Sequence, residues 1–371
     1  MLSPLTQAQS ARARRNWKLA RDLYFRTEAG ERGADRQHEA AAGSSRRFDE
    51  RQGYGANSDL AERLVEGGAI NDGPHQSASH ANVAGGSGIG SGTRFSVERS
   101  QIQHRLDILQ KNLDSNQQVR EEEVSKFDDN AMPDLIALAN RKRPGLNAHL
   151  VIGVNAFVEK MLNLLAKGAR SFRIVARSLD QIHFVAFDVD NDGSRTSIIA
   201  IEPVWITAAG ANSLAPMCAI ALRAKLPDAE FLIVNGQMQH SGGECGMFSL
   251  FLAKMMFKAA DDLKLLHEDT ALPRFYQSRM PVSSDVLPPR FMKHTQPRSR
   301  VEEYLSKNEN RAGDVVNKRD EALQPRFMRH WGEWNTYEAG PRRFSRSIEV
   351  KRVREYQALL DAMDEENHGQ P

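Results

Sequence analysis

Residues 239–250, Gln-His-Ser-Gly-Gly-Glu-Cys-Gly-Met-Phe-Ser-Leu, contain the change of pattern on which the fold of this chain depends. The apolar run Glu230–Asn235 before them predicts a strand, and the apolar run Gly246–Leu265 after them predicts a long helix. A turn of small residues joins the two, and Cys245 stands where the helix begins. Because a helix N-terminus stabilises negative charge, this position favours a thiolate, and Cys245 is the candidate nucleophile.

The segments around this stretch predict a mixed arrangement of strands and helices. The turn Asp190–Gly193 is a strong hairpin signal between two of the strands. The expected strands are Ser171–Ala176, Ile182–Phe187 and Thr196–Glu202, and the expected helices are Phe157–Lys167 and Ser213–Ala224. Strands that alternate with helices indicate an α/β or α+β fold, with a catalytic core at residues 150–265.

The flanking segments have different compositions. Residues 1–95 are polar, and their Gly/Ser-rich part at 81–93 is typical of a flexible linker, so we expect a disordered leader. Residues 96–149 predict two helices, at 96–123 and 132–140. Residues 266–371 predict a looser region that ends in an amphipathic helix at 347–363.

The composition excludes several classes of protein. The chain has 371 residues and a net charge of only +2, which gives no overall attraction to nucleic acid. Its two cysteines, Cys218 and Cys245, cannot form a disulfide framework or a multi-cysteine zinc site. No apolar run is long enough to span a bilayer, and the N-terminus lacks the apolar region of a secretory signal. We therefore expect no metal, no nucleic-acid partner and no transmembrane segment.

A cysteine nucleophile needs a base and a group that orients the base. His183 lies in the predicted strand Ile182–Phe187, and Glu202 ends the next strand. In a hairpin centred between residues 192 and 193, these two are equally far from the centre, so we expect them opposite one another across the ladder. A single strand histidine or buried cysteine is more often structural. Together, the three residues predict a Cys–His–Glu triad.

The order His183, Glu202, Cys245, with Glu-Cys-Gly at the nucleophile, resembles the YopJ family of bacterial type III effectors. The similarity extends over about residues 100–362 and does not include the leader. Further matching motifs are Met132–Asn140, Leu287–Gln296, Glu303–Leu305, Val315–Lys318 and Lys351–Leu360. The resemblance implies a papain-like, ubiquitin-like-protease-like cysteine core. It also implies a helical regulatory region made of the segments before and after that core.

The resemblance implies transfer of acetyl from acetyl-CoA to Ser, Thr or Lys of host proteins, after type III secretion into the host cell. The host cytoplasm is the expected site, with the membrane and the nucleus as alternatives. Gln239 matches the family's oxyanion-hole glutamine. The triad alone does not distinguish this activity from a cysteine protease acting on ubiquitin or ubiquitin-like modifiers, because both chemistries pass through a Cys thioester. A binding protein without activity is a third reading, against which the intact triad argues.

The resemblance also implies activation by inositol hexakisphosphate. Several cationic side chains must converge to hold such a polyanion. The residues that match are Lys293, His294, Lys318, Arg319 and Arg326, with Lys142 or Arg141 from the upstream helix. Lys293 also resembles the lysine that family members autoacetylate. The alternative is that these residues form an ordinary solvated basic face.

Overall fold

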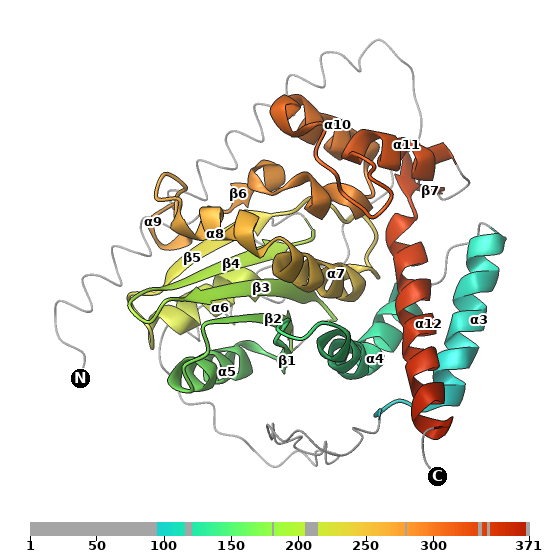
Figure 1. Cartoon of the computed structure of the whole chain (residues 1–371), viewed down its shortest axis with the longest axis horizontal. Coiled ribbons are helices and arrows are strands. Elements are labelled where there is room, and N and C mark those ends of the chain that lie inside the picture. The colour runs from blue at the N-terminus through green and yellow to red at the C-terminus, as the bar shows by residue number, and fades with distance from the viewer. Residues whose placement is uncertain are drawn as a thin grey trace, which may run out of the picture. The chain divides into compact units, whose positions relative to one another are not determined.

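A six-stranded mixed sheet forms the centre of the part of the chain that the computed structural model describes, shown in Figure 1. The described residues are 95–115, 121–179, 182–204, 214–278, 280–332, 336–339 and 342–368. The predicted leader and its linker lie outside them. The strands are β1 Ala148–Ile152, β2 Ser171–Arg177, β3 Phe184–Asn191, β4 Thr196–Glu202, β5 Glu230–Asn235 and β6 Val282–Ser283.

The strands follow one another across the sheet in chain order. The central strands β2, β3 and β4 pair antiparallel, whereas β1, β5 and β6 join their neighbours in parallel. A parallel pair needs a crossover connection, and helices α5 Val154–Ala166 and α6 Leu214–Arg223 supply two of these. The mixed α/β class is therefore confirmed, although β1 was not among the predicted strands.

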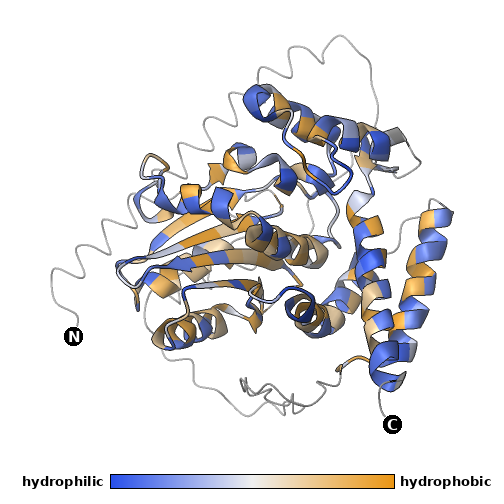
Figure 2. Cartoon of the chain, in the orientation of Figure 1, coloured by the Kyte–Doolittle hydropathy of each residue, from blue (hydrophilic) through white to orange (hydrophobic). Residues whose placement is uncertain are grey.

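Both faces of the sheet are buried, because successive side chains of a strand point to opposite faces. In β3, Phe184 and Ala186 pack on the side of α7 (Cys245–Lys258), whereas Val185 and Phe187 pack on the side of α5 and α6. Figure 2 shows the corresponding concentration of hydrophobic residues in the strands and in α7. Each fully buried side chain of this size contributes about 1.5–3 kcal/mol, so the alternation fixes the register of the sheet.

The long helix predicted after the cysteine is two helices, and this prediction was wrong in its length. Helix α7 ends at Lys258, and α8 spans Ala260–Glu268. Ala259 leaves helical geometry between them, with φ −112° and ψ 30°. The break turns α8 so that Leu263 enters the core and His267 reaches the sheet, and no glycine or proline marks it in the sequence.

Helices from both ends of the described chain cover the α7 side of the core. They are α3 Arg99–Asp114, α4 Glu121–Lys142 and α12 Ser347–His368, which pack together beside α7 in Figure 1. The short helix predicted at 132–140 is the second half of α4, which continues through Pro133. Buried residues such as Val124 and Leu135 on both sides of the proline hold this helix against the core.

The remaining elements lie between β5 and α12. They are α9 Phe275–Ser278, η1 Ser284–Val286, η2 Pro289–His294, α10 Arg298–Lys307, η3 Glu309–Arg311, α11 Leu323–Gly332 and the hairpin β7 Thr336–Ala339 with β8 Arg342–Ser345. Within the described ranges, no helix is both long enough and apolar enough to cross a membrane.

Candidate active site

Cys245 is the first residue of α7 and is buried, with 3% of its surface exposed. Strands β4 and β5 are parallel, and Glu202 pairs with Asn235, so both strands end at the same edge of the sheet. The chain then turns at Gly236, where a Cβ atom would lie only 2.4 Å from the Glu202 carbonyl oxygen. The glycine thus lets residues 236–244, which we call the nucleophile loop, leave the sheet directly beside Glu202 and lead to Cys245.

His183 and Glu202 meet at this edge, with Nε2 of the imidazole 2.9 Å from Oε1 of the carboxylate. The predicted register was nevertheless wrong. Ala186 pairs with Ile201, which places Glu202 in register with Val185, and His183 precedes β3 instead of lying within it. The difference is two residues, which leaves both side chains on the same face of the sheet. A diagonal contact is within reach of side chains this long.

The surroundings of His183 favour its charged form. Burial opposes the charge, but the Glu202 carboxylate and the hydrogen bond with Cys245 outweigh it and raise the pKa of His183 above its ordinary value. The Cys245 thiol also donates to the Ile182 carbonyl oxygen at 3.3 Å. In contrast, burial alone raises the pKa of the Cys218 thiol, which makes it a poor nucleophile.

Gln239 lies on the nucleophile loop, where the structure places it against its own backbone. Its Nε2 donates to the Ser241 carbonyl oxygen at 2.5 Å, and its Oε1 is buried without a hydrogen-bond partner among the described residues. A side-chain amide carries two N–H donors. One of them is engaged here, and the other is the group that an oxyanion would need.

Gln296 and Glu121, neither of which the sequence indicated for this role, form hydrogen bonds to the backbone of the nucleophile loop. Gln296 is fully buried, and its Oε1 accepts hydrogen bonds from the backbone N–H groups of His240 at 2.6 Å and Ser241 at 3.1 Å. Glu121, at the start of α4, accepts from the N–H of Gly242 at 2.9 Å. A glutamine and a glutamate far away in the sequence carry no recognisable signal for this role.

The structure brings three of the predicted basic residues together. Lys293 and His294 end η2, and Arg326 of α11 donates to the Lys293 carbonyl oxygen and, at 3.1 Å, to Ser347 Oγ. His294 Nδ1 lies 2.8 Å from the same hydroxyl. Burial, followed by the charges of Arg326 and nearby lysines, lowers the pKa of Lys293 to about 7 and that of His294 well below its ordinary value.

The other predicted basic residues are more dispersed. Lys318 and Arg319 are exposed, and the charge of Lys318 acts on Lys258. Exposed Lys142 donates to the Ala358 carbonyl oxygen of α12 at 3.5 Å, while Arg141 pairs with Glu366. After burial, the charges of Lys258 and Lys351 contribute to the lowered pKa of Lys293. After burial, the charges of Arg143, Lys351 and Lys318 contribute to the lowered pKa of Lys258. We use the name basic cluster for Arg143, Lys258, Lys293, His294, Lys318, Arg326 and Lys351.

A cysteine at a helix N-terminus, facing a histidine–carboxylate pair at the edge of a sheet, is the arrangement of the papain-like class of cysteine enzymes. The sequence profile of the YopJ Serine/Threonine acetyltransferase family matches residues 102–358. The chain therefore belongs to this family and is an acetyltransferase, as predicted. In the part that the structure describes, no group of three or more His, Cys, Asp or Glu could hold a metal ion.

Individual relatives agree with this assignment. The serine/threonine-protein acetyltransferase YopJ of Yersinia pestis is 35% identical over 242 residues, which are 64% of this chain and 82% of that protein. The solved structure of an AvrA deletion variant with IP6 and CoA matches with a TM-score of 0.63 and 31% identity, over 71% of this chain and 99% of that chain. HopZ1a in complex with IP6 matches over the same shares with a TM-score of 0.53 and 17% identity, which shows the fold alone.

Proposed function

We propose that this chain is a type III secreted effector that acetylates serine and threonine residues of host proteins, with lysine as a further acceptor. The host cytoplasm is its expected site of action. The observation that carries the proposal is the convergence of Cys245, His183 and Glu202 at one edge of the sheet. The relatives named as serine/threonine-protein acetyltransferases support acetyl transfer over proteolysis.

The arrangement of these residues supports a two-step reaction. Glu202 occupies Nε2 of His183, which leaves Nδ1 to take the proton from Cys245. The thiolate attacks the acetyl carbonyl carbon of acetyl-CoA, and the bond to the CoA sulfur breaks as CoA leaves with that proton. His183 then removes the proton of an acceptor hydroxyl, whose oxygen attacks acetyl-Cys245 and regenerates the thiol. The Cys245 backbone N–H and the free N–H of Gln239 stabilise the oxyanion in both steps.

The basic cluster is the proposed site of inositol hexakisphosphate, the IP6 of the solved AvrA and HopZ1a complexes. Burial lowers the pKa of Lys293 and of His294, and the charges of Arg326 and the neighbouring lysines lower both further, so cations lie close together there. A polyanion relieves that repulsion and receives charge-assisted hydrogen bonds from several elements at once. Lys293, Arg326 and Lys351 come from η2, α11 and α12, so the ligand joins separate parts of the regulatory region.

The proposal is tested by incubating the full chain with labelled acetyl-CoA, inositol hexakisphosphate and host-cell extract. We expect label on serine or threonine of host proteins with the wild type and none with Cys245→Ala. Omission of inositol hexakisphosphate should reduce the labelling. Cleavage of ubiquitin or ubiquitin-like conjugates without any acetyl transfer would instead establish the alternative, a cysteine protease.

A further inference from the structure

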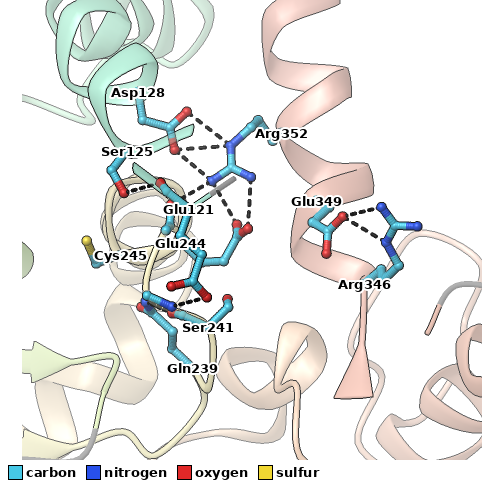
Figure 3. Close-up of polar contacts among 12 residues, drawn as sticks. Glu121, Ser125, Asp128, Gln239, Ser241, Glu244, Cys245, Arg346, Glu349 and Arg352 are labelled. Carbon is cyan, nitrogen blue, oxygen red and sulfur yellow. Dashed lines mark hydrogen bonds and ion pairs between the residues drawn. The ribbon is translucent and has the colours of Figure 1, made fainter. Parts of the chain in front are cut away.

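A buried ionic network lies beside Cys245, and it joins helices α4 and α12, which lie outside the catalytic core, to the residues just before Cys245 (Figure 3). Arg352 of α12 is only 1% exposed. Its Nε and Nη2 donate to the Asp128 carboxylate of α4 at 3.0 and 2.8 Å. Its Nη1 donates to Glu244 at 3.0 Å, and Nη2 also donates to the Gly243 carbonyl oxygen at 3.1 Å.

The composition of this network indicates a specific role. Asp128 and Glu244 are also buried, and a buried ion pair adds little net stability compared with apolar residues of the same shape. Burial raises the pKa of Glu244 to about 7 although Arg352 opposes this shift. Tyr356, one turn further along α12, also donates to Asp128. The planar guanidinium can contact two carboxylates and a carbonyl at fixed angles, which a lysine cannot do.

On the nucleophile loop, Arg352 contacts Glu244 and Gly243, the two residues that directly precede Cys245. Glu244 is the N-cap residue of α7, and its side chain makes no capping hydrogen bond. At Gly243, a Cβ atom would lie 3.0 Å from the backbone oxygen of Glu121, so the turn is pressed against α4. The turn at residues 243–244 therefore sets the direction of the Cys245 side chain, and Arg352 forms hydrogen bonds to both residues of that turn.

We propose that Arg352 is the positioning residue of the nucleophile, through which α12 holds the 243–244 turn and so directs Cys245 toward His183. The inference rests on the proposed function, in which Cys245 is the nucleophile. Lys351, the neighbour of Arg352 on α12, belongs to the basic cluster. One turn of α12 therefore contacts both the proposed activator site and the nucleophile loop.

The rate of Cys245 alkylation by iodoacetamide tests this role in the full chain, read by mass spectrometry of the two cysteine peptides. Cys218 is fully buried, so its alkylation reports unfolding in the same sample. The matched control is Arg346→Gln, because Arg346 is also 1% exposed on the chain segment entering α12 but bonds to Glu349 and to the Asn112 carbonyl oxygen of α3. The rates are measured across about pH 6–9.

We expect Arg352→Gln to slow Cys245 alkylation by about tenfold to a hundredfold over this range while Cys218 stays protected, because small misplacements of a reacting group have effects of this size. Asp128→Asn and Glu244→Gln each leave Arg352 with one carboxylate partner. Each should therefore slow Cys245 alkylation less than Arg352→Gln does. Arg346→Gln should react at the wild-type rate. Wild-type alkylation in a folded Arg352→Gln variant, or equal slowing in Arg346→Gln, would overturn the proposal.

Alkylation of Cys218 in Arg352→Gln would mean that this variant is unfolded. In that case the role of Arg352 is decided by the two carboxylate variants, Asp128→Asn and Glu244→Gln. Slower alkylation of Cys245 in both, with Cys218 protected, supports the positioning role, and wild-type rates in both refute it. Alkylation requires neither acetyl-CoA nor an acceptor protein. A wild type that shows this pattern but transfers no acetyl would refute the proposed function and leave the role of Arg352 intact.

Discussion

Two buried histidine–carboxylate pairs of this enzyme have their carboxylates on the same sheet, and they differ in what surrounds them. His183 lies 2.9 Å from Glu202 and faces Cys245. His267 of α8 lies 3.1 Å from Asp188 through Nε2 and 2.9 Å from the Ser197 hydroxyl through Nδ1. The second set has the residue types of a serine hydrolase triad, and its distances are equally short.

The charges around the carboxylates separate the two pairs. Asp188 is already paired with Arg173, whose Nε lies 2.6 Å from its other oxygen. Among the described residues, no lysine or arginine lies within ion-pair distance of Glu202, so its charge acts on His183. Ser197 is itself fully buried within β4, whereas Cys245 is the first residue of a helix. A carboxylate without a lysine or arginine partner and a cysteine at a helix N-terminus therefore distinguish the proposed catalytic set from the second set.

The largest difference between the two sets should appear when their nucleophile-like residues are removed. Cys245→Ala should lower acetyl transfer by about a thousandfold or more, because the covalent route is lost. Ser197→Ala should leave transfer within about twofold and cost about 1–3 kcal/mol of stability, because His267 Nδ1 loses its partner. Steady-state assays and urea unfolding measure the two effects. A large loss of activity in a folded Ser197→Ala variant would contradict the comparison.

Neutralising the two carboxylates should have opposite effects: the change at Glu202 should lower kcat, and the change at Asp188 should lower stability. Glu202→Gln should lower kcat by about a hundredfold to ten-thousandfold, because the imidazolium loses its stabilising charge and its fixed tautomer. Asp188→Asn should retain kcat but destabilise the fold by about 3 kcal/mol, since it leaves Arg173 buried without a charged partner. Denaturant midpoints and turnover are measured on the same preparations. Equal losses of kcat in both variants would remove the distinction drawn here.

A third buried histidine, His294, has cations instead of a carboxylate around it and extends the comparison to ligand binding. Lys293 beside it has a pKa of about 7, so near neutral pH it is partly uncharged. A bound polyanion raises that pKa, and binding of inositol hexakisphosphate therefore takes up protons. The affinity for inositol hexakisphosphate should therefore be highest below about pH 7, and it should fall by up to about tenfold per pH unit above that pH.

Calorimetry in buffers of different ionisation enthalpy measures this proton uptake. Lys293→Met should reduce it by up to about one proton. Lys264→Met, at an exposed lysine of α8 paired with Glu268, should leave it unchanged. Binding without proton uptake in the wild type would show that Lys293 does not face the ligand.

Local patterns predicted most of the core but not its long-range contacts. The limits of β4 and β5 match those expected from the apolar runs, and the hairpin signal placed His183 and Glu202 on one face. The register was two residues off because the loop length of a hairpin depends on its turn geometry. Asp128, Arg352 and Gln296 were missed since each acts across a long sequence separation. A charged residue inside an apolar helix pattern, as at Arg352, is the signal that could have pointed to the network.

The location of the acetyl group after a single turnover tests the central claim most directly. The wild type is mixed with acetyl-CoA and inositol hexakisphosphate without an acceptor, quenched in acid and mapped by peptide mass spectrometry. We predict one acetyl group on the peptide that contains Cys245, removable by hydroxylamine and absent from Cys245→Ala and His183→Ala. An enzyme that acetylates its acceptors without ever carrying acetyl on Cys245 would contradict the account.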